Sequence, residues 1–179
     1  MYKRQVVLNA QPTTDVVLSI SSSDTGEATA TSSLTFTTAN WNSPKTVTIT
    51  GVDDDIIDGT QNSTITVSII DGISDDAFDS VADQTVSVTT ADDDVAGFTV
   101  TETEGSTGVS ESGSTDLFAI VLNTQPSSDV VLSITSSDTG EATVDSLIQF
   151  TTANWDTPQN VTVTGVDDGI IDGLSLIHI

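Results

Sequence analysis

Residues 45–55 read KTVTITGVDDD, a run of alternating apolar and hydroxyl side chains that ends in three aspartates. Residues 159–168 read QNVTVTGVDD, nearly the same run 114 positions later. Apolar side chains at every second position, most of them β-branched, predict a β-strand with one buried face. Similar short runs at 15–20, 63–69 and 84–89 are separated by turn sequences. With no helical periodicity beside them, these runs predict an all-β chain.

The similarity between the two parts of the chain extends well beyond this strand. Residues 6–59 and 120–173 share 38 identical residues in 54 aligned positions. Similarity this high indicates a duplicated unit, and a period of 114 residues suits an independent domain better than one turn of a solenoid. Several short strands separated by turns in a unit of this size predict an antiparallel, immunoglobulin-like β-sandwich. We therefore expect β-sandwiches in tandem repeats.

Neither occurrence of the unit contains all the predicted strands. A unit begins with the strand near 97–100, so the first copy, assigned to residues 6–95, lacks its first strand. The second copy, assigned to residues 96–173, ends before it reaches counterparts of the strands at 63–69 and 84–89. We expect both copies to be truncated.

The two ends differ from the rest of the chain. Residues 1–5 (MYKRQ) and 174–179 (LSLIHI) hold three of the four lysine, arginine and histidine residues. One reading frame of a transposon end used to fragment DNA for sequencing encodes LSLIHI. Its reverse complement encodes MYKRQ when GTG serves as the start codon. We predict that both ends are translated sequencing adapter, exclude them from fold reasoning, and expect residues 6–173 to be an internal piece of a longer chain.

The composition excludes several classes of function. The 179 residues include 27 Asp and Glu against 3 Lys and Arg, and the formal net charge is −24. A surface this acidic repels phosphate backbones, which excludes nucleic acid as a partner, and no apolar run approaches the roughly 18 residues of a membrane span. With no cysteine and one histidine, disulfides, thiol chemistry, the usual zinc sites and histidine base catalysis drop out. We expect no enzyme activity.

Most of the acidic residues lie directly after predicted strands or in turns. The clustered carboxylates are Asp24, Asp53, Asp54, Asp55, Asp58, Asp92, Asp93, Asp94 and Asp138. Neighbouring carboxylates raise one another's pKa and destabilise a compact fold unless a cation neutralises them. Calcium accepts about six to eight oxygen ligands in irregular geometry, whereas magnesium requires a stricter octahedron. The clusters predict calcium sites, with solvated acidic loops as the alternative. We assign to such a loop Asp75, Asp76, Asp79 and Asp83.

These residues give the chain a resemblance to the Calx-beta domain, a β-sandwich named from the sodium–calcium exchanger and abundant in bacterial surface proteins. The marks of the family are a V-S-E motif near the first strand, a D-D-D motif after a central strand, and a closing D-D-D followed by A-G. Here they correspond to residues 109–111, 53–55 and 92–97. The resemblance covers essentially all of residues 6–173.

The resemblance implies a calcium site at one end of each sandwich. Carried over by position, the implied ligands are Asp24, Asp53, Asp54, Asp55, Asp58, Asp92, Asp93 and Asp94 in the first copy, and Glu111, Asp138, Asp167, Asp168 and Asp172 in the second. The chain departs from the family in two places. The acids behind the central D-D-D motif are reduced to Asp58, and Gly169 replaces the third aspartate in the second copy. These departures weaken the expectation of full calcium occupancy.

We therefore expect a calcium-binding structural repeat of a large protein, secreted or attached to a bacterial cell surface, in which Ca²⁺ stiffens a stalk for adhesion. The expected partners are neighbouring repeats of the same chain, with a surface polysaccharide or protein beyond them. Two alternatives stay open: an adhesive domain that itself binds a polysaccharide or protein, and a metal-independent acidic spacer attached to a distant enzyme. Trp41 and Trp155 are expected to pack at corners of the fold rather than to bind sugars.

Overall fold

The computed structural model describes residues 2–167, which form two compact units. Among the described residues, the first unit comprises 2–54 and 58–92, and the second comprises 55–57 and 93–167. In chain order the elements are β1 (Tyr2–Val6), β2 (Val16–Ser22), β3 (Ala28–Ala30), β4 (Ser33–Phe36), β5 (Lys45–Gly51), β6 (Gln61–Ile69), the short 3-10 helices η1 (Asp71–Ile73) and η2 (Asp76–Phe78), β7 (Gln84–Thr90), β8 (Phe98–Glu102), the 3-10 helix η3 (Thr103–Gly105), β9 (Thr115–Leu122), β10 (Val130–Ser133), β11 (Ala142–Val144), β12 (Leu147–Phe150) and β13 (Gln159–Gly165).

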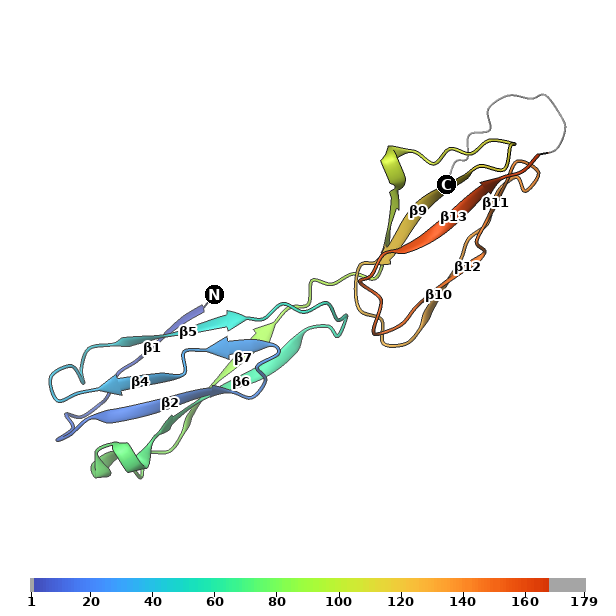
Figure 1. The fold of residues 1–179 in the computed structure, drawn as a ribbon. Helices are drawn as coiled ribbons and strands as arrows, with labels where there is room; N and C mark the ends of the chain where they lie inside the picture. The colour runs from blue at the N-terminus through green and yellow to red at the C-terminus, as the bar shows by residue number, and fades with distance from the viewer. Residues whose placement is uncertain (1, 168–179) are drawn as a thin grey trace. The chain divides into compact units, whose positions relative to one another are not determined.

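The first unit is a β-sandwich of two antiparallel sheets (Figure 1). One sheet has the strand order β1-β5-β3 and the other has the order β4-β2-β6-β7. The core draws on both sheets, because Ile20 of β2 and Ile65 of β6 pack with Val47 and Ile49 of β5. Buried and less buried residues alternate along β2, as the period of two requires when one face of a strand is buried.

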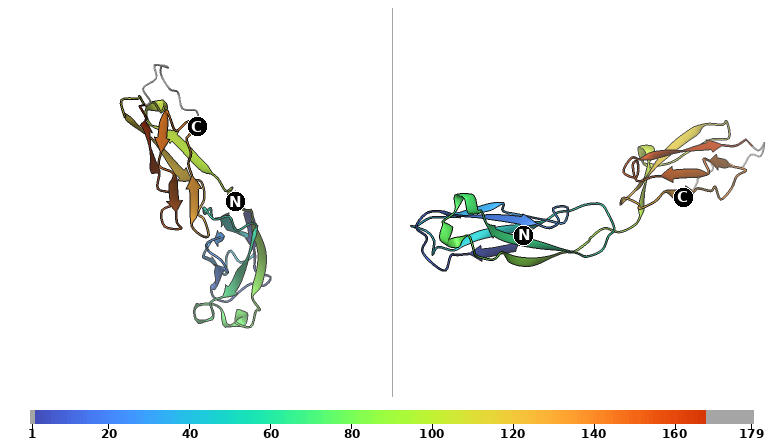
Figure 2. Two further views of the ribbon diagram at one scale, coloured as in Figure 1. Left: turned by 90° about the vertical axis from the view of Figure 1, so that its right-hand side faces the viewer. Right: turned by 90° about the horizontal axis from the view of Figure 1, so that it is seen from below.

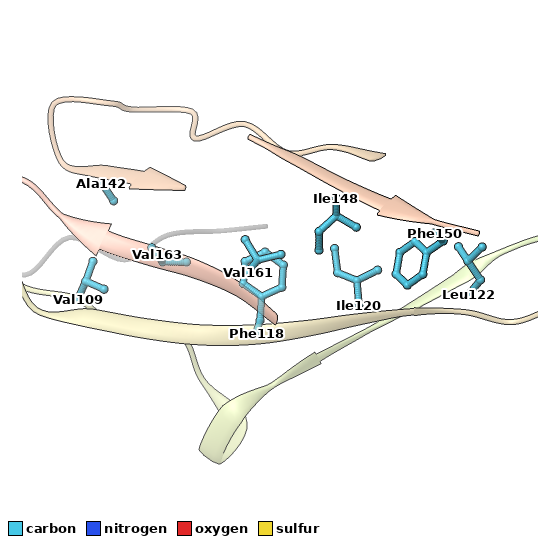
Figure 3. Packing of buried hydrophobic residues seen from close by; sticks show 9 residues of the cluster. All are labelled: Val109, Phe118, Ile120, Leu122, Ala142, Ile148, Phe150, Val161 and Val163. Carbon is cyan, nitrogen blue, oxygen red and sulfur yellow. The ribbon is translucent and has the colours of Figure 1, made fainter. Parts of the chain in front are cut away.

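The second unit has the same two-layer arrangement (Figure 2). Its larger sheet has the strand order β11-β13-β9-β8, and its smaller sheet pairs β10 with β12. Side chains from both sheets form one buried cluster, in which Phe118 of β9 and Val161 of β13 meet Ile148 and Phe150 of β12 (Figure 3). The prediction of an all-β chain folded as antiparallel sandwiches is confirmed.

The strands of the two units recur 114 residues apart. β3, β4 and β5 correspond residue for residue to β11, β12 and β13, and β9 contains the positions equivalent to β1. Among the described residues, each unit also holds strands without an equivalent in the other. β6 and β7 extend the β2 sheet of the first unit, and β8 extends the β9 sheet of the second. Within residues 2–167, no strand takes the place of β6 beside β10, and none takes the place of β8 beside β1.

Residues 2–5, which we excluded from the fold on sequence grounds, belong to β1. This strand pairs antiparallel with β5, from Tyr2 opposite Ile49 to Val6 opposite Lys45. The sequence YKRQV has no apolar alternation, so local pattern did not indicate a strand; β1 forms because the edge of β5 supplies backbone partners. The segment 174–179 lies outside the described residues.

Candidate functional site

The candidate site lies where the turn at 24–27 meets the ends of β5 and β7. The carbonyl oxygen of Glu27 accepts one hydrogen bond from the Val52 N–H at 2.9 Å and another from the Thr90 hydroxyl at 3.1 Å. Val52 directly follows β5, and Thr90 is the last residue of β7. One backbone group therefore gathers three segments that are far apart in the sequence, and the side chain of Glu27 is half-buried there.

Four aspartates act on the carboxylate of Glu27. Burial raises the pKa of Glu27, and the negative charges of Asp58, Asp54, Asp24 and Asp92 raise it further. The turn at 24–27 and the segments that follow β5 and β7 lie at the same end of the sandwich, since hydrogen bonds join Glu27 to Val52 and Thr90, and Asp92 to Gly59. A half-buried acid among like charges is disfavoured in its ionised form, so the cluster stores repulsion that a cation would relieve.

Two hydrogen bonds from backbone N–H groups orient carboxylates of this cluster. Asp92 Oδ2 accepts a hydrogen bond from the Gly59 N–H at 2.7 Å, which holds the loop at Asp58 against the end of β7. Gly59 has φ +74°, a conformation that glycine adopts without strain. Asp24 Oδ1 accepts a hydrogen bond from the Gly26 N–H at 3.0 Å and closes the turn that leads to Glu27.

Only part of the ligand set predicted for the first copy raises the pKa of Glu27. Asp24, Asp54, Asp58 and Asp92 do so. The predicted ligands whose charges are not among those acting on Glu27 are Asp53, Asp55, Asp93 and Asp94. The last three of these belong to the second compact unit, whereas Asp53 is an exposed residue of the first.

The second unit repeats part of this geometry. The carbonyl of Glu141, which is equivalent to Glu27, accepts a hydrogen bond from the Val166 N–H at 2.9 Å. Asp138 Oδ1 accepts a hydrogen bond from the Gly140 N–H at 3.0 Å, which reproduces the turn around Asp24. The other predicted ligands are Glu111, which is half-buried, Asp167, which is exposed, and Asp168 and Asp172, which lie outside the described residues.

Glu27 is not among the ligands predicted from the sequence. The repeat offered one sign of this residue, because Glu27 and Glu141 follow Asp24 and Asp138 by three residues in the identical sequence DTGEAT. However, a single glutamate between a turn and a short strand does not form an acidic cluster in the sequence. Its importance comes from backbone contacts to Val52 and Thr90, which only the folded chain brings together.

Asp75 is not the solvated loop residue that we predicted. Its side chain is 5% exposed and accepts hydrogen bonds from the Thr13 hydroxyl and from the N–H groups of Thr13, Thr14 and Ala77. These bonds lower the pKa of Asp75 to about 2, and the Thr13 hydroxyl has the largest effect. Asp75 therefore fastens the loop of η1 and η2 to the turn before β2. The other acids assigned to the solvated loop, Asp76, Asp79 and Asp83, are exposed as predicted.

The donor atoms at Glu27 suit a hard cation. All five side chains offer carboxylate oxygens, the ligand type that calcium takes. Within residues 2–167, however, no group of three or more histidine or acidic side chains has an arrangement that could hold a metal ion. The chemistry of the residues thus fits calcium, whereas the spacing of the described side chains does not form a metal site.

The tryptophans lie at the corners expected from the sequence. The Trp41 carbonyl accepts a hydrogen bond from the Leu8 N–H at 3.2 Å, and the Trp155 carbonyl accepts one from the Leu122 N–H at 3.1 Å. Both side chains are half-buried, and that of Trp155 packs against the core of the second unit. For Trp155, this confirms a packing role.

No family model matches the chain, and no curated protein matches it. The part of the chain that the structure describes contains no helix with the length and hydrophobicity of a membrane span. The fold and the carboxylates define an antiparallel β-sandwich protein whose acidic side chains gather at strand ends.

Proposed function

We propose that this chain is a calcium-binding structural repeat of a large extracellular or cell-surface protein. The observation that carries the proposal is Glu27, a half-buried carboxylate whose pKa is raised by burial and by four aspartates. A divalent cation would convert this repulsion into attraction. The resemblance to the Calx-beta domain supports calcium, and so does the preference of calcium for many oxygen ligands in irregular geometry.

Several acidic residues of the first unit would bind the ion, each in a different way. Asp24 and Asp92 are already oriented by the Gly26 and Gly59 N–H groups, so their carboxylates are preorganised. Asp54 and Asp58 are exposed residues of the first unit, and their carboxylates would supply further oxygen ligands. Glu27 would bind from the side of the sandwich. The role is structural, since these acids cluster among like charges and lack the apolar cleft that keeps one carboxylic acid protonated for catalysis.

The mechanical consequence lies in the segment that follows β7. Asp92 lies two residues beyond Thr90, the last residue of β7, and β8 begins at Phe98. Fixing Asp92 would restrain this segment and so stiffen a string of repeats, as a stalk for adhesion requires. Extracellular modules of this kind need only weak sites, with dissociation constants of about 10⁻⁴–10⁻³ M.

Thermal unfolding of the full chain in calcium, in magnesium and in chelator tests this proposal. At calcium concentrations about fiftyfold above the dissociation constant, linkage predicts a rise in the midpoint of about 10 °C for the first unit. Magnesium should raise it much less. Equal curves in all three solutions would leave the metal-independent acidic spacer, and equal shifts with both metals would indicate charge screening alone.

Substitution of Glu27 separates ion binding from simple repulsion. Glu27→Gln should raise the midpoint in chelator at neutral pH and greatly reduce the calcium response. The sign follows from the raised pKa of Glu27: ionisation costs folding stability above that pKa, and stability returns as the pH falls through it. Asp83→Asn is the matched control, because Asp83 is an exposed acid whose charge is not among those acting on Glu27. An undiminished calcium response in Glu27→Gln would contradict the proposal.

A further inference from the structure

The peptide bond between Asp58 and Gly59 lies in the loop between β5 and β6, and both residues are exposed. In an aspartate–glycine pair, the backbone nitrogen attacks the preceding side-chain carboxyl more readily than in other pairs, because glycine has no Cβ to obstruct the approach. Gly59 has φ +74°, and a Cβ built on it would meet no atom within 4 Å. The loop is therefore uncrowded beside this nitrogen.

Two hydrogen bonds polarise this peptide group from its two ends. Its N–H, that of Gly59, donates to Asp92 Oδ2 at 2.7 Å. Its carbonyl oxygen, that of Asp58, accepts a hydrogen bond from Gln61 Nε2 at 2.9 Å. A carboxylate at the N–H takes up the proton as it leaves nitrogen, and a donor at the carbonyl stabilises the negative charge that then develops on oxygen. Both contacts make the Gly59 nitrogen a better nucleophile.

We propose that Asp58–Gly59 is a modification site, at which the chain converts Asp58 to isoaspartate with Asp92 as the proton acceptor. The reaction uses only the chain's own groups, water and a proton from solvent. The inference deepens the proposed function and rests on it in one respect. Asp58 is a ligand of the proposed calcium site, so its conversion would age that site.

The conversion passes through a cyclic imide. The Gly59 nitrogen bonds to Cγ of Asp58 and gives its proton to Asp92. One carboxyl oxygen of Asp58 then leaves as water, taking that proton from Asp92 and a second proton from solvent. Water next adds to either carbonyl of the imide and breaks the bond from that carbonyl to nitrogen. Cleavage at Cγ restores aspartate, and cleavage at the α-carbonyl leaves the main chain running through the former side chain, which is isoaspartate.

The product keeps the charge of the loop but changes its geometry. Isoaspartate adds one carbon to the main chain before Gly59 and leaves its carboxylate directly on Cα. The peptide group that Asp92 and Gln61 hold is thereby displaced. We expect the converted chain to bind calcium more weakly, because the carboxylate of residue 58 no longer reaches as far.

A second aspartate–glycine pair in the first unit provides an internal comparison. Asp71 and Gly72 are exposed and belong to the 3-10 helix η1. The Asp71 carbonyl accepts a longer hydrogen bond, 3.3 Å, from the Ser74 N–H of the same turn. Helical ψ angles keep the following nitrogen away from the side-chain carboxyl carbon, so Asp71 should convert more slowly than Asp58. The pairs at 168–169 and 172–173 lie outside the described residues.

Incubation of the full chain in chelator at neutral pH, in water enriched in oxygen-18, tests the modification site. Each passage through the imide adds one heavy oxygen to residue 58, whichever carbonyl the water attacks. Mass spectrometry with electron-based fragmentation locates the label and distinguishes the two isomers. We expect label and isoaspartate to accumulate about tenfold faster at Asp58 than at Asp71, the factor that one charge-assisted hydrogen bond supplies. Absence of label at Asp58, or equal rates at the two pairs, would overturn the proposal.

Substitution of Asp92 tests the proton acceptor in the same assay. Asp92→Asn keeps the shape of the side chain and removes its charge, so conversion of Asp58 should slow about tenfold. Asp83→Asn, which removes an exposed acid elsewhere in the first unit, should leave the rate unchanged. Faster conversion in Asp92→Asn would mean that the hydrogen bond protects the peptide, and it would overturn the role of Asp92.

Substitution of Gln61 tests the donor at the carbonyl. Gln61→Met keeps the length of the side chain and should slow conversion of Asp58 about threefold, since it removes a neutral hydrogen bond. Gln84→Met is the matched control, because Gln84 Nε2 also donates to a backbone carbonyl, that of Ala82 at 3.1 Å, at the other end of β7. Equal effects of the two variants would refute the polarisation of the Asp58–Gly59 peptide.

Replacing the chelator with calcium tests the link to the proposed function. A bound ion would hold the Asp58 carboxylate and compete for Asp92, so calcium should slow conversion at Asp58 and leave the rate at Asp71 unchanged. Conversion in chelator that calcium does not slow would contradict the proposed calcium site and support the modification site. Absence of conversion in chelator would overturn the modification site alone, so the two failures are distinguishable.

Discussion

The two units share equivalent strands, but the buried side chains form one continuous cluster in the second unit and two separate clusters in the first. Among the described residues, the second unit has a single cluster of nine buried residues (Figure 3), whereas the buried residues of the first unit fall into two clusters. Phe118, 1% exposed, joins both sheets of the second unit. The equivalent residue of the first unit is Arg4, which is exposed, although the two have equivalent partners, Val161 and Val47.

This difference separates strand pairing from core formation. β1 pairs with β5 along its whole length in the same register that β9 keeps with β13. Backbone pairing is therefore satisfied without an apolar side chain at position 4. What the first unit lacks is the aromatic side chain that would join its clusters.

The largest effect that we predict breaks the core of the second unit. Phe118→Ala should lower its free energy of unfolding by about 3–5 kcal/mol, because it removes a buried aromatic ring and leaves a cavity. Fluorotryptophan labelling gives one ¹⁹F signal for each unit, from Trp41 and Trp155, so denaturant unfolding can be followed separately. Arg4→Ala at the equivalent position should change the stability of the first unit by less than about 0.5 kcal/mol. Comparable losses in both units would refute this account of the two cores.

An intermediate effect should distinguish two equivalent glycines. A Cβ at Gly165 would lie 2.1 Å from the Ser110 carbonyl oxygen and 2.7 Å from its carbon. A Cβ at Gly51 would meet nothing closer than the Thr90 Cγ2 at 3.9 Å. Gly165→Ala should therefore destabilise the second unit by about 1–3 kcal/mol through overpacking against backbone, and Gly51→Ala should be nearly neutral. The same two ¹⁹F signals report the result, and a loss at Gly51 equal to that at Gly165 would contradict it.

The smallest effect concerns Asp75, which belongs to the first unit alone. Because its pKa is lowered to about 2, Asp75 stabilises the fold above its ordinary pKa near 3.8, and this stability is lost as the pH falls through about 2. Asp79 has the opposite effect on stability, because its ionised form is disfavoured in the folded chain. Burial raises the pKa of Asp79, and the charges of Asp71, Asp76 and Asp75 raise it further.

Asp75→Asn should lower the unfolding midpoint of the first unit by several degrees at neutral pH. The difference from the unchanged chain should shrink as the pH approaches 2, where the unchanged chain has also lost the carboxylate. Midpoints from the Trp41 signal between pH 7 and pH 2 measure this, with the Trp155 signal as the internal control. A pH-independent difference would mean that the hydrogen bonds of Asp75 do not depend on its ionised form.

The sequence predicted the long strands better than the short ones. The alternation in β5 and β13 indicated a half-buried strand directly, whereas β3 and β4 have three and four residues, too few for a period to emerge. Strand length also depends on partners. β2 reaches Ser22 because Ile20, Ser21 and Ser22 pair with β6. β10 ends at Ser133, where its pairing with β12 ends. It is shorter than β2 although residues 130–136 are identical to β2 at six of seven positions.

The candidate site could be predicted in kind more readily than in detail. Runs of aspartate after strands identified Asp54, Asp58 and Asp92, because strand ends gather at the ends of a sandwich. Which acidic residues join the cluster at Glu27 depends on turns and on connections between the sheets, and the alternation of apolar residues does not specify these. This is why Glu27 was missed, and why Asp75, buried through its contacts with a turn 61 to 62 residues away, was taken for a solvated acid.

The backbone carbonyl of Glu27 also has a bearing on how the first unit carries load. It binds Val52 after β5 and Thr90 at the end of β7, and so fastens the ends of strands from two different sheets to one turn. Tension applied to the chain beyond β7 would load the hydrogen bond between Asp92 and Gly59 first, and then Thr90, which is held both by the Glu27 carbonyl and by its pairing with Gln61 of β6. Resistance to stretching therefore begins at this end of the sandwich, beside the carboxylates whose charge an ion would neutralise.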